Sequence, residues 1–478
     1  MMVMTMNKNE VSRAYQDMKM SKYNIYAEDK DGNLVIYNFM TGFSSLVMVK
    51  EPFKEKFKNM FVLSKVVHDP KLDDFGTVVT ALLERGILID ANQDEDTLYY
   101  AKAYEDTYDN DLYMTVLTTG KCNFHCSYCL EEEQEFSKGR LTEEAQKAIV
   151  KFVRKNICNH KGLHLTWFGG EPMLEMDTII SLSQKMEKIC RARYVPYAAQ
   201  ITTNGYMLND ENFQKLYESK VYNYMITVDG FKEQHDKYRC MHNGAGTYDV
   251  IMKNLLSIRD NPQYRFAHII IRINVTREVL NVMDKLIEFL DDTFSADSRF
   301  RIMFVPVVNY SSKPVSCNEY ISTPELSEKL NSNQLYLSKF KPEELNMYFL
   351  NPGRGCVSSL KNSFVFSPNL TVYKCVAHYD MAENRLGYLN MDGDLIIDEN
   401  LHKRWYVLKD KNMQEACKDC FYLPACADMS RGCPYRNFHS LKKPESCRLK
   451  EEGFVKELEK EVVFATKKYP YYIIDGPI

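Results

Sequence analysis

Hydrophobic positions follow two alternating patterns from residue 112 onward. Short apolar runs, two of which place apolar side chains at every second residue, alternate with stretches of helical period. The runs predict strands at 112–117, 163–167, 198–202, 222–228, 268–275 and 300–305. The stretches between them predict helices at 143–156, 178–193, 211–218, 248–259 and 282–291. This alternation predicts an α/β fold with a parallel sheet, open or closed into a partial (β/α)6 barrel, that binds ligands at the carboxyl ends of its strands.

The first hundred residues predict a separate small module. Strand-like runs at 23–26 and 34–37 flank Asp31-Gly32, a dipeptide that favours a tight hairpin turn, and a third run follows at 45–49. Asp74 is placed to cap a helix that ends at Gly86, before another strand-like run at 87–89. Strand pairs with short helices predict a winged-helix-like module over residues 1–105.

The regular α/β pattern occupies residues 106–310 and stops after Pro306. A polar connector is predicted over 311–350, with a helix near 323–337, and a cysteine-rich domain over 351–450. Segments dense in cysteine and poor in long apolar periods are usually held together by bound metal. An amphipathic helix at 451–465 and an aromatic tail complete the chain over 451–478.

Composition narrows the class of protein. The 61 basic and 65 acidic residues give a net charge of −4 without a basic block, which argues against nucleic-acid binding. No run reaches the roughly 18–20 apolar residues of a membrane helix. The first residues carry no apolar secretion signal, so a cytoplasmic protein is expected. In that reducing compartment, 14 cysteines indicate metal ligation or redox chemistry rather than disulfides.

Three cysteines directly follow the first predicted strand. Cys122, Cys126 and Cys129 place three thiolates on one tight loop, close enough to share an iron–sulfur cubane. Three protein ligands on four irons leave one iron free to bind an amine and a carboxylate of another molecule. The competing interpretations are incidental cysteines, or a zinc site completed by His125.

The sequence around these cysteines resembles a known family. Cys122-Asn-Phe-His-Cys126-Ser-Tyr-Cys129, with the aromatic Tyr128 before the last cysteine, resembles the signature of radical S-adenosylmethionine (SAM) enzymes. The second strand ends in Phe168-Gly169-Gly170-Glu171-Pro172, which resembles the glycine-rich motif of that family. We expect Gly169 and Gly170 to let the backbone approach the methionine moiety of SAM, and Glu171 to accept from its ammonium group.

Later strand ends continue the resemblance. Thr203-Asn204-Gly205 ends the third strand, and Thr227-Val-Asp229-Gly230 ends the fourth, with His235-Asp236 and Arg239 following. In the family, such positions line the nucleoside and carboxylate of SAM. The resemblance therefore implies polar contacts to SAM from Thr227, Arg239, Asn204 and Asn274, and it places Tyr128 of the cysteine motif among the SAM-binding residues. Taken alone, Asn204-Gly205 is equally well a turn, and Asp229 a cap of the loop backbone.

The C-terminal cysteines resemble the SPASM extension of radical SAM enzymes that modify peptides and proteins. The resemblance implies one auxiliary 4Fe–4S cluster on Cys417, Cys420, Cys426 and Cys447, and a second on Cys356, Cys375 and Cys433. Cys317 is a candidate fourth ligand of the second cluster. The alternative is a zinc-stabilised subdomain.

Two departures from the SPASM pattern leave the cluster geometry open. Leu370 stands where the family has glycine, so the turn must be made differently, for example with Asn369. The six residues between Cys426 and Cys433 form a longer gap than usual. The remaining cysteines are expected to be buried, inert thiols: Cys158, Cys190 and Cys240.

The resemblance implies SAM and three 4Fe–4S clusters as cofactors, and a 5′-deoxyadenosyl radical that abstracts hydrogen from a substrate carbon. A small module before such a core resembles the element that recognises the leader of a ribosomally made precursor peptide, by pairing it with a strand edge. We therefore expect a thioether-forming peptide maturase, served by an electron donor such as flavodoxin or ferredoxin. Carbon–carbon crosslinking, anaerobic sulfatase maturation to formylglycine, and a zinc-stabilised binding protein without enzyme activity are the alternatives.

Overall fold

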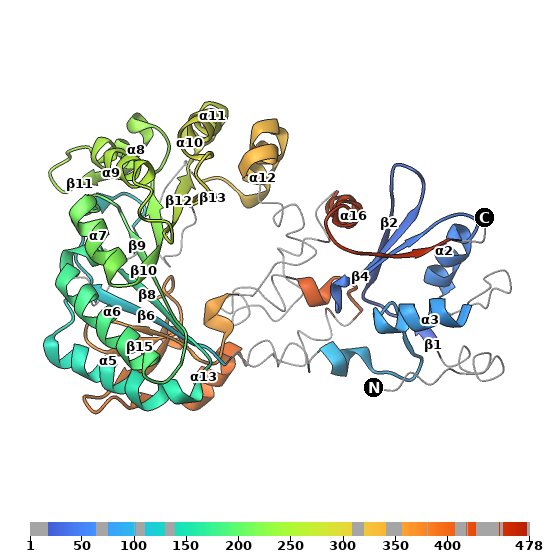
Figure 1. Cartoon of the computed structure of the whole chain (residues 1–478), viewed down its shortest axis with the longest axis horizontal. Helices are drawn as coiled ribbons and strands as arrows, with labels where there is room; N and C mark the ends of the chain where they lie inside the picture. Colours follow the sequence, from blue (N-terminus) through green and yellow to red (C-terminus); the bar gives the residue numbers. More distant parts are fainter. Residues whose placement is uncertain are drawn as a thin grey trace. The chain divides into compact units, whose positions relative to one another are not determined.

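The computed structural model describes residues 18–63, 75–99, 101, 110–129, 139–307, 320–340, 356–379, 381–406, 417, 419–426, 449 and 453–475. Contacts divide the chain into two compact units. Unit 1 comprises residues 1–108, 342–360 and 406–478, and unit 2 comprises 109–341 and 361–405. Each unit has its own sheet (Figure 1).

A ten-stranded sheet in the order β13-β12-β10-β9-β8-β6-β14-β15-β16-β17 forms the centre of unit 2. Six of its strands are β6 (Leu112–Thr119), β8 (Leu163–Gly169), β9 (Tyr197–Thr203), β10 (Val221–Thr227), β12 (His268–Val275) and β13 (Phe300–Pro306). Neighbours among these six pair in parallel. The predicted α/β fold with a parallel sheet is confirmed, and the predicted strand ends are right to within two residues.

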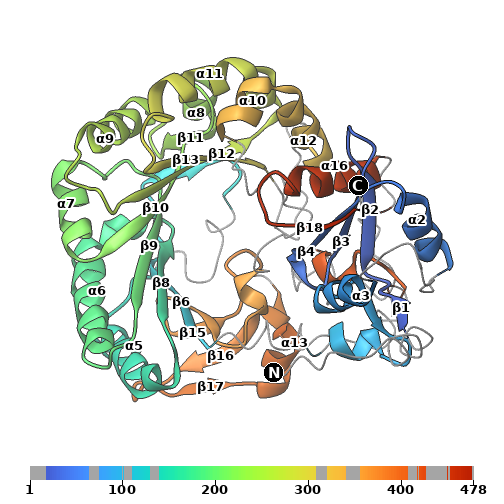
Figure 2. The same cartoon turned by 45° about the vertical axis from the view of Figure 1, so that its right-hand side comes forward.

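Helices between these strands cover the outer face of the sheet (Figure 2). They are α5 (Glu143–Asn156), α6 (Met176–Arg191), α7 (Asp210–Glu218), α8 (Lys232–Tyr238), α9 (Tyr248–Asp260), α10 (Arg277–Asn281) and α11 (Met283–Phe294). The side chain of Thr142 caps α5 by accepting from the Ala145 N–H, and Asn209 caps α7 in the same way. Helix α12 (Thr323–Ser332) follows the last parallel strand. No helix in the described part of the chain is long and apolar enough to cross a membrane.

Four strands and a helix of unit 2 were not foreseen from the sequence. They are β14 (Ser363–Phe366), β15 (Thr371–Tyr373), β16 (Arg385–Leu389), β17 (Leu395–Ile397) and α13 (Glu399–Tyr406). Strand β14 extends the sheet in parallel beside β6, and the next three strands add antiparallel. The stretch 351–450, predicted to be a cysteine-rich domain, therefore contributes residues 361–405 to the sheet of unit 2.

The turn between β14 and β15 contains the residue that replaces the family glycine. Leu370 has a φ of +64°, a left-handed conformation that glycine adopts without strain. Asn369 supports the turn, because its side-chain oxygen accepts from the Ser367 hydroxyl at 2.5 Å and the Thr371 N–H at 3.3 Å. The expectation that Asn369 helps to make this turn fits these contacts.

Unit 1 is built on a four-stranded sheet in the order β18-β4-β3-β2. Its strands are β2 (Asn24–Glu28), β3 (Leu34–Asn38), β4 (Gly42–Val49) and β18 (Tyr472–Ile474), and β1 (Met18–Met20) pairs separately with β5 (Leu88–Asp90). The predicted hairpin is present, with Gly32 at a φ of +80°. Helices α2 (Lys54–Leu63) and α3 (Phe75–Glu84) complete the N-terminal part. Asp74 lies outside the described residues, and the winged-helix assignment stays a prediction.

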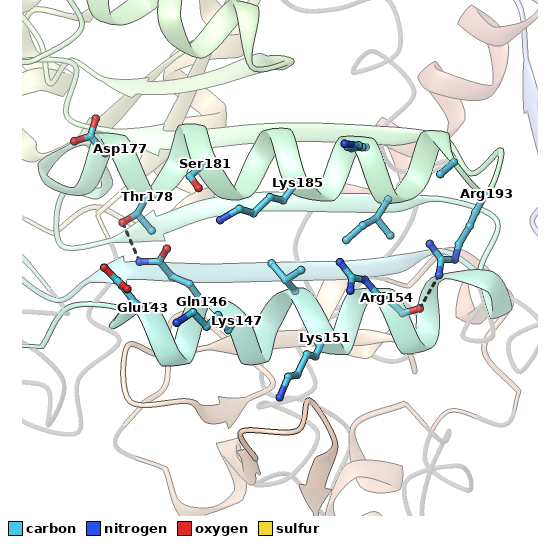
Figure 3. Close-up of a pocket in the computed structure, with 14 residues that line it drawn as sticks. Glu143, Gln146, Lys147, Lys151, Arg154, Asp177, Thr178, Ser181, Lys185 and Arg193 are labelled. Carbon is cyan, nitrogen blue, oxygen red and sulfur yellow. Dashed lines mark hydrogen bonds between the residues drawn. The ribbon is translucent and has the colours of Figure 1, made fainter.

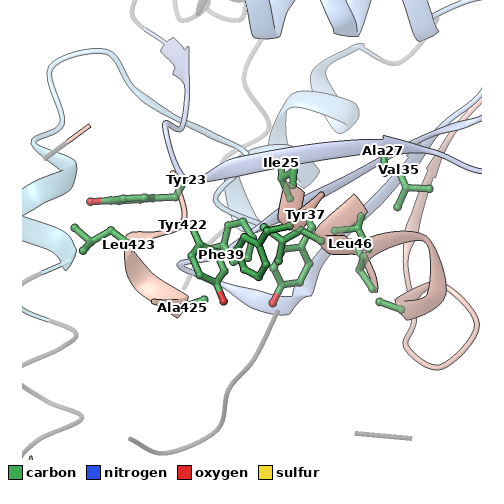
Figure 4. Close-up of a cluster of buried hydrophobic side chains, with 14 of the residues drawn as sticks. Tyr23, Ile25, Ala27, Val35, Tyr37, Phe39, Leu46, Tyr422, Leu423 and Ala425 are labelled. Atoms are coloured by element: carbon green, nitrogen blue, oxygen red, sulfur yellow. The ribbon is translucent and has the colours of Figure 1, made fainter. Parts of the chain in front are cut away.

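Two apolar cores cover the two faces of this sheet. One core includes Phe53, Phe57 and Leu82, from the region of α2 and α3. The other joins the N-terminal strands to helix α16 (Phe454–Ala465) and to the segment 417–426 (Figure 4). Phe39 packs edge-on against Tyr422, with ring centres 5.1 Å apart. The C-terminal helix, predicted as a separate tail, therefore shares a core with the N-terminal module.

Candidate functional site

The loop after β6 carries the three cysteines predicted to ligate a cluster. Its strand β7 (Phe124–Cys126) pairs with β11 (Arg239–Met241), which sets Cys126 opposite Arg239. The Ser127 N–H donates to the Tyr238 carbonyl at 3.1 Å, and the Cys129 N–H donates to the Cys126 carbonyl at 3.1 Å. The loop is therefore fixed by backbone bonds that do not involve the thiols.

The chemistry of the thiols suits a cationic partner. Burial raises the pKa of Cys122 to about 12 and that of Cys126 to about 11. Thiols of this kind become thiolates when a metal cluster binds them. Within the described ranges, no three His, Cys, Asp or Glu side chains are arranged to hold a metal ion. The donor set fits an iron–sulfur cluster, and its assignment to Cys122, Cys126 and Cys129 stays a prediction.

Two glycines lock the end of β8 against this loop. Gly169 has a φ of +126°, and a Cβ atom there would lie 2.2 Å from the Thr119 carbonyl oxygen. At Gly170, a Cβ atom would lie 2.4 Å from the Lys121 carbonyl oxygen. The Glu171 N–H donates to that same oxygen at 2.8 Å. Close packing of two backbones thus requires both glycines, in addition to the approach of SAM for which they were predicted.

Glu171 joins the ends of β8 and β9 from a buried position with only 1% of its surface exposed. Its carboxylate accepts from the Thr203 hydroxyl at 2.7 Å, the Met173 N–H at 3.0 Å and the Asn204 N–H at 2.7 Å. Burial raises the pKa of Glu171, while these donors act against that shift. Both oxygens already accept protein donors, so the structure supports a positioning role, and the predicted ammonium contact stays a prediction.

Asn204 ties the end of β9 to the cysteine loop. Its side-chain amide donates to the Asn123 side-chain oxygen at 2.8 Å, and its own oxygen accepts from the Tyr206 N–H at 3.0 Å. Asn123 lies between the first two cysteines, and the sequence motif gave no reason to single it out. The predicted SAM contact of Asn204 stays a prediction, whereas its link to the loop is a direct hydrogen bond.

A polar network at the hydroxyl of Tyr128 joins three further elements. The phenol donates to the Asp229 carboxylate and accepts from the Arg239 guanidinium at 3.1 Å and the Asn274 amide at 3.2 Å. The Asn274 N–H donates to the other Asp229 oxygen at 2.8 Å. Burial, together with the negative charge of Asp229, raises the pKa of Tyr128, so the phenol keeps its proton. Thr227 lies buried two residues before Asp229.

Arg239 has a donor left for a ligand. Its Nε atom is buried and has no hydrogen-bond partner among the residues that the structure describes. A buried donor without a partner is costly, and an anionic group beside the cysteine loop would satisfy it. The carboxylate of SAM has the right chemistry, so the residues present fit this cofactor.

A neutral histidine supports the network from behind. His235 accepts from the Asp229 N–H at 3.1 Å through Nδ1, and its Nε2 lies 3.1 Å from the Thr247 hydroxyl. Burial lowers the pKa of His235 to about 3. Thr247 in turn donates to the Arg239 carbonyl at 2.6 Å. Nothing in the sequence around Thr247 signals this contact.

The remaining cysteines show separate local structures. Residues 419–426 form turns, and the Cys420 N–H donates to the Cys417 carbonyl at 3.0 Å. Cys375 follows β15, and its N–H donates to the Asn384 side chain at 2.7 Å. Cys356 lies beside the Ser358 hydroxyl at 2.9 Å. Outside the described residues lie Cys317, Cys433 and Cys447, so both auxiliary ligand sets stay predictions.

The three cysteines expected to be inert differ in exposure. Cys190 is buried, as expected. Cys158 is exposed and Cys240 partly exposed, so the expectation was wrong for these two. Cys158 follows the last turn of α5, where its sulfur accepts from the Arg193 guanidinium at 3.1 Å. Helix α5 ends at Asn156, two residues before Cys158, so the buried face of the helix does not extend to this cysteine.

Comparisons with known proteins cover the part of the chain that carries this site. Residues 116–295 match the model of the radical SAM superfamily. The chain is 24% identical over 345 residues to a cysteine-type anaerobic sulfatase-maturating enzyme of Clostridium novyi (strain NT), which covers 67% of this chain and 87% of that protein. It is 24% identical over 209 residues to the radical SAM cyclopropyl synthase TigE of Paramaledivibacter caminithermalis, covering 40% of this chain and 43% of TigE.

Solved structures share the fold. The structure of anSMEcpe with bound AdoMet aligns with a TM-score of 0.54 at 17% identity, over 74% of this chain and 94% of that one. SuiB of Streptococcus suis, bound to its precursor peptide SuiA, aligns with a TM-score of 0.50 at 13% identity, over 90% of this chain and 99% of that one. Residues 116–295 thus match the radical SAM superfamily, and the chain is an enzyme that resembles sulfatase maturases in sequence and shares its fold with anSMEcpe and SuiB.

Proposed function

We propose that the enzyme is a peptide maturase that binds a ribosomally made precursor through unit 1 and joins a cysteine sulfur to a substrate carbon in a thioether. The observation that carries the proposal is strand β2, which lies at the edge of the four-stranded sheet. In the described part of the chain, β2 pairs with β3 alone. An edge strand of this kind offers main-chain donors and acceptors to an extended peptide.

The pattern of β2 suits such a role. Ile25 and Ala27 are buried in the core, while Tyr26 and Glu28 are exposed. The strand is therefore anchored by one face and keeps its outer edge for pairing. The likeness to SuiB supports the proposal, because that fold spans 90% of this chain whereas anSMEcpe spans 74%. SuiB was solved with a precursor peptide bound.

The residues of unit 2 prepare the radical site. Cys122, Cys126 and Cys129 would hold one 4Fe–4S cluster, and the open donor of Arg239 would receive the carboxylate of SAM. When bound, SAM and the clusters supply hydrogen-atom abstraction and accept the surplus electron. Thioether formation removes one hydrogen from the carbon and one from the thiol, which is a two-electron oxidation. Tyr128 fixes the position of the cysteine loop through its hydrogen bonds with Arg239 and Asn274.

Sulfatase maturation is the second candidate function. It is favoured by the relative from Clostridium novyi, of which this chain covers 87%. Both functions use the same strand-end site in unit 2. They differ in the product and in the need for an edge strand in unit 1.

The product distinguishes the candidates. Full-length enzyme, reconstituted without oxygen, is incubated with SAM, a reductant and a cysteine-containing peptide encoded in a neighbouring gene. A thioether leaves the peptide lighter by two hydrogen atoms, with its sulfur retained and no longer alkylated by iodoacetamide. A carbon–carbon crosslink shows the same loss with a thiol that still alkylates. Formylglycine, in which sulfur is replaced by oxygen, would overturn the proposal.

Hydrogen exchange tests the recognition step. The peptide should slow exchange of the amides in β2, because pairing gives them new partners. Strand β17, at the edge of the other sheet, serves as the matched control and should be unaffected. Protection of β17 without protection of β2 would contradict recognition through unit 1.

A further inference from the structure

Helices α5 and α6 enclose a groove of about 940 Å³ on the outer face of the sheet in unit 2 (Figure 3). Both helices line it along most of their length. Val150, half-buried on α5, and Ile189, buried on α6, supply apolar surface inside it. The groove is thus an amphipathic channel rather than a purely polar cleft.

The charge along the groove is unevenly distributed. Its basic lining residues are Lys147, Lys151, Arg154, Lys185, Lys188 and Arg193. Only Glu143 and Asp177 are acidic, and both lie in the first turn of their helices, where carboxylates offset the helix dipole (Figure 3). The rest of the groove is therefore strongly positive.

The helix dipoles explain some of these basic residues, but they do not explain why basic side chains of two helices line the same groove. Cations in the last turn of a helix complement its dipole, which explains Arg154 and Lys188 individually. The structure shows no acidic partner, within its described residues, for Lys147, Arg154, Lys185 or Lys188. Like charges that face one another across a groove repel, and an anion between them removes that cost.

Two lysines of α5 already contact an acidic segment of this chain. Lys155, which does not line the groove, pairs with Asp394 at 2.6 Å, and Lys151, at the rim of the groove, donates to the Met391 carbonyl at 2.9 Å. Both partners belong to the acidic turn between β16 and β17. In Figure 3, Lys151 extends away from α6. An acidic stretch of polypeptide therefore docks on α5 beside the groove, and the groove itself presents a comparable row of cations.

We propose that the α5–α6 groove is a docking site for an acidic polypeptide segment of a partner protein. Its carboxylates would pair with Lys147, Lys185 and Lys188, and an apolar side chain would rest on Val150 and Ile189. Crossover helices run antiparallel to their strands. The carboxyl halves of α5 and α6 therefore lie toward the amino ends of the strands, whereas the cysteine loop lies at the carboxyl ends. Lys185, Lys188 and Ile189 of α6 therefore lie away from the radical site, and the inference stands independently of the proposed function.

Fluorescence anisotropy of a labelled probe tests the site in the full-length protein. The probe is a short fluorescein-labelled peptide in which glutamates flank two leucines. The double variant Lys185→Glu/Lys188→Glu should weaken its binding about tenfold, because two attractions become repulsions. Lys253→Glu/Lys285→Glu makes the same charge change at exposed lysines of α9 and α11, and should weaken it less than twofold. SAM cleavage should be unchanged in both double variants.

Two further comparisons identify the occupant. Replacing the leucines of the probe by serine should weaken its binding to the parent protein several-fold, and Val150→Ser should reduce that difference. Equal effects of the two double variants would overturn the site. Tighter binding of a DNA oligonucleotide or of vesicles with anionic lipid, lost on Lys185→Glu/Lys188→Glu, would overturn the polypeptide as occupant. Equal binding of the leucine and serine probes would overturn the apolar contact.

Discussion

At the scale of single residues, the hydroxyl of Tyr128 is the contact on which the cysteine loop depends most. It binds Asp229, Arg239 and Asn274 at once. Tyr128→Phe should lower the free energy of unfolding by about 1–3 kcal/mol, because buried polar groups lose their partner. SAM should also bind more weakly, while the maximal rate at saturating SAM changes less.

Urea unfolding and the KM for SAM measure the two effects. Tyr206→Phe is the control, since Tyr206 packs edge-on against Phe124 of the same loop, with ring centres 5.8 Å apart, without joining the network. Equal losses in the two variants would show that the Tyr128 hydroxyl has no special role.

His235 makes stability depend on pH. Burial lowers its pKa from 6.5 to about 3 in the folded protein. As the pH falls below 6.5, the unfolded chain binds a proton that the folded chain does not, so stability is lost. This loss should amount to about 2 kcal/mol between pH 7 and pH 5. Urea unfolding of the parent and of His235→Gln at both pH values measures it.

The His235→Gln variant should start less stable and lose about 2 kcal/mol less than the parent over that range. His268→Gln, at an exposed position, controls for the loss of a histidine. A His235→Gln variant with the same pH dependence as the parent would remove His235 as the cause.

Leu370 tests backbone strain against burial. Its φ of +64° costs about 1–2 kcal/mol, while its side chain is 3% exposed and contributes about 1.5–3 kcal/mol. Both Leu370→Gly and Leu370→Ala should destabilise, but glycine should be better than alanine by about 1 kcal/mol because it relieves the strain. At Leu386, a buried position of β16 without positive φ, alanine should be better than glycine.

Residues that a motif singled out lie in the segments where the sequence placed them, while their contacts to SAM stay predictions. Gly169 ends β8, Tyr128 lies on the cysteine loop, and Arg239 begins β11 after the end of β10. Their partners Asn123 and Thr247 were not foreseen. Asn204 lies 81 residues from Asn123 in the chain. A hydrogen bond between residues so far apart produces no pattern by which the sequence alone could predict it.

At the scale of elements, prediction depended on length and exposure. Strands β6 to β13 and their helices are long enough to show a period, and caps such as Thr142 mark where a helix begins. Strands β14 and β15 have four and three residues, all buried. Without alternation between buried and exposed residues, a short strand resembles any apolar loop.

Strand β15 is tied to β14 by a buried lysine. Lys374, with 1% of its surface exposed, donates to the Ser363 carbonyl at 2.8 Å and the Lys361 carbonyl at 3.2 Å. Lys374→Met should cost about 1–3 kcal/mol, because both carbonyls lose their donor. Faster hydrogen exchange in β14 and β15 should accompany the loss. Lys403→Met, at an exposed position of α13, should leave both measurements unchanged.

At the scale of the whole molecule, the two ends of the chain form one unit. Residues 1–108 and 406–478 belong to unit 1, and α16 packs on the N-terminal sheet. From the sequence the two ends are predicted as separate segments, because local patterns carry no information about packing between residues so far apart in the chain. Removal of residues 1–100 would therefore expose the apolar side of α16 and of segment 417–426. Point variants test leader recognition more cleanly than this truncation does.

Phe39 offers such a test of the shared core. Its ring lies 5.1 Å from that of Tyr422 and 5.2 Å from that of Tyr37. Phe39→Ala should cost about 3–5 kcal/mol, because a buried aromatic ring is replaced by a cavity. The loss should speed hydrogen exchange in α16, more than four hundred residues along the chain, and leave β6 in unit 2 protected.

The matching variant in unit 2 is Phe366→Ala. Phe366 is fully buried in β14 and lies 5.5 Å from Phe152 of α5. Phe366→Ala should show the reverse pattern, because each variant loosens only the core of its own unit. Hydrogen exchange should become faster in β6 and α5 and stay unchanged in α16. Exchange that rises in both units with either variant would show that they unfold together, and the division of the chain into two cores would then not govern its stability.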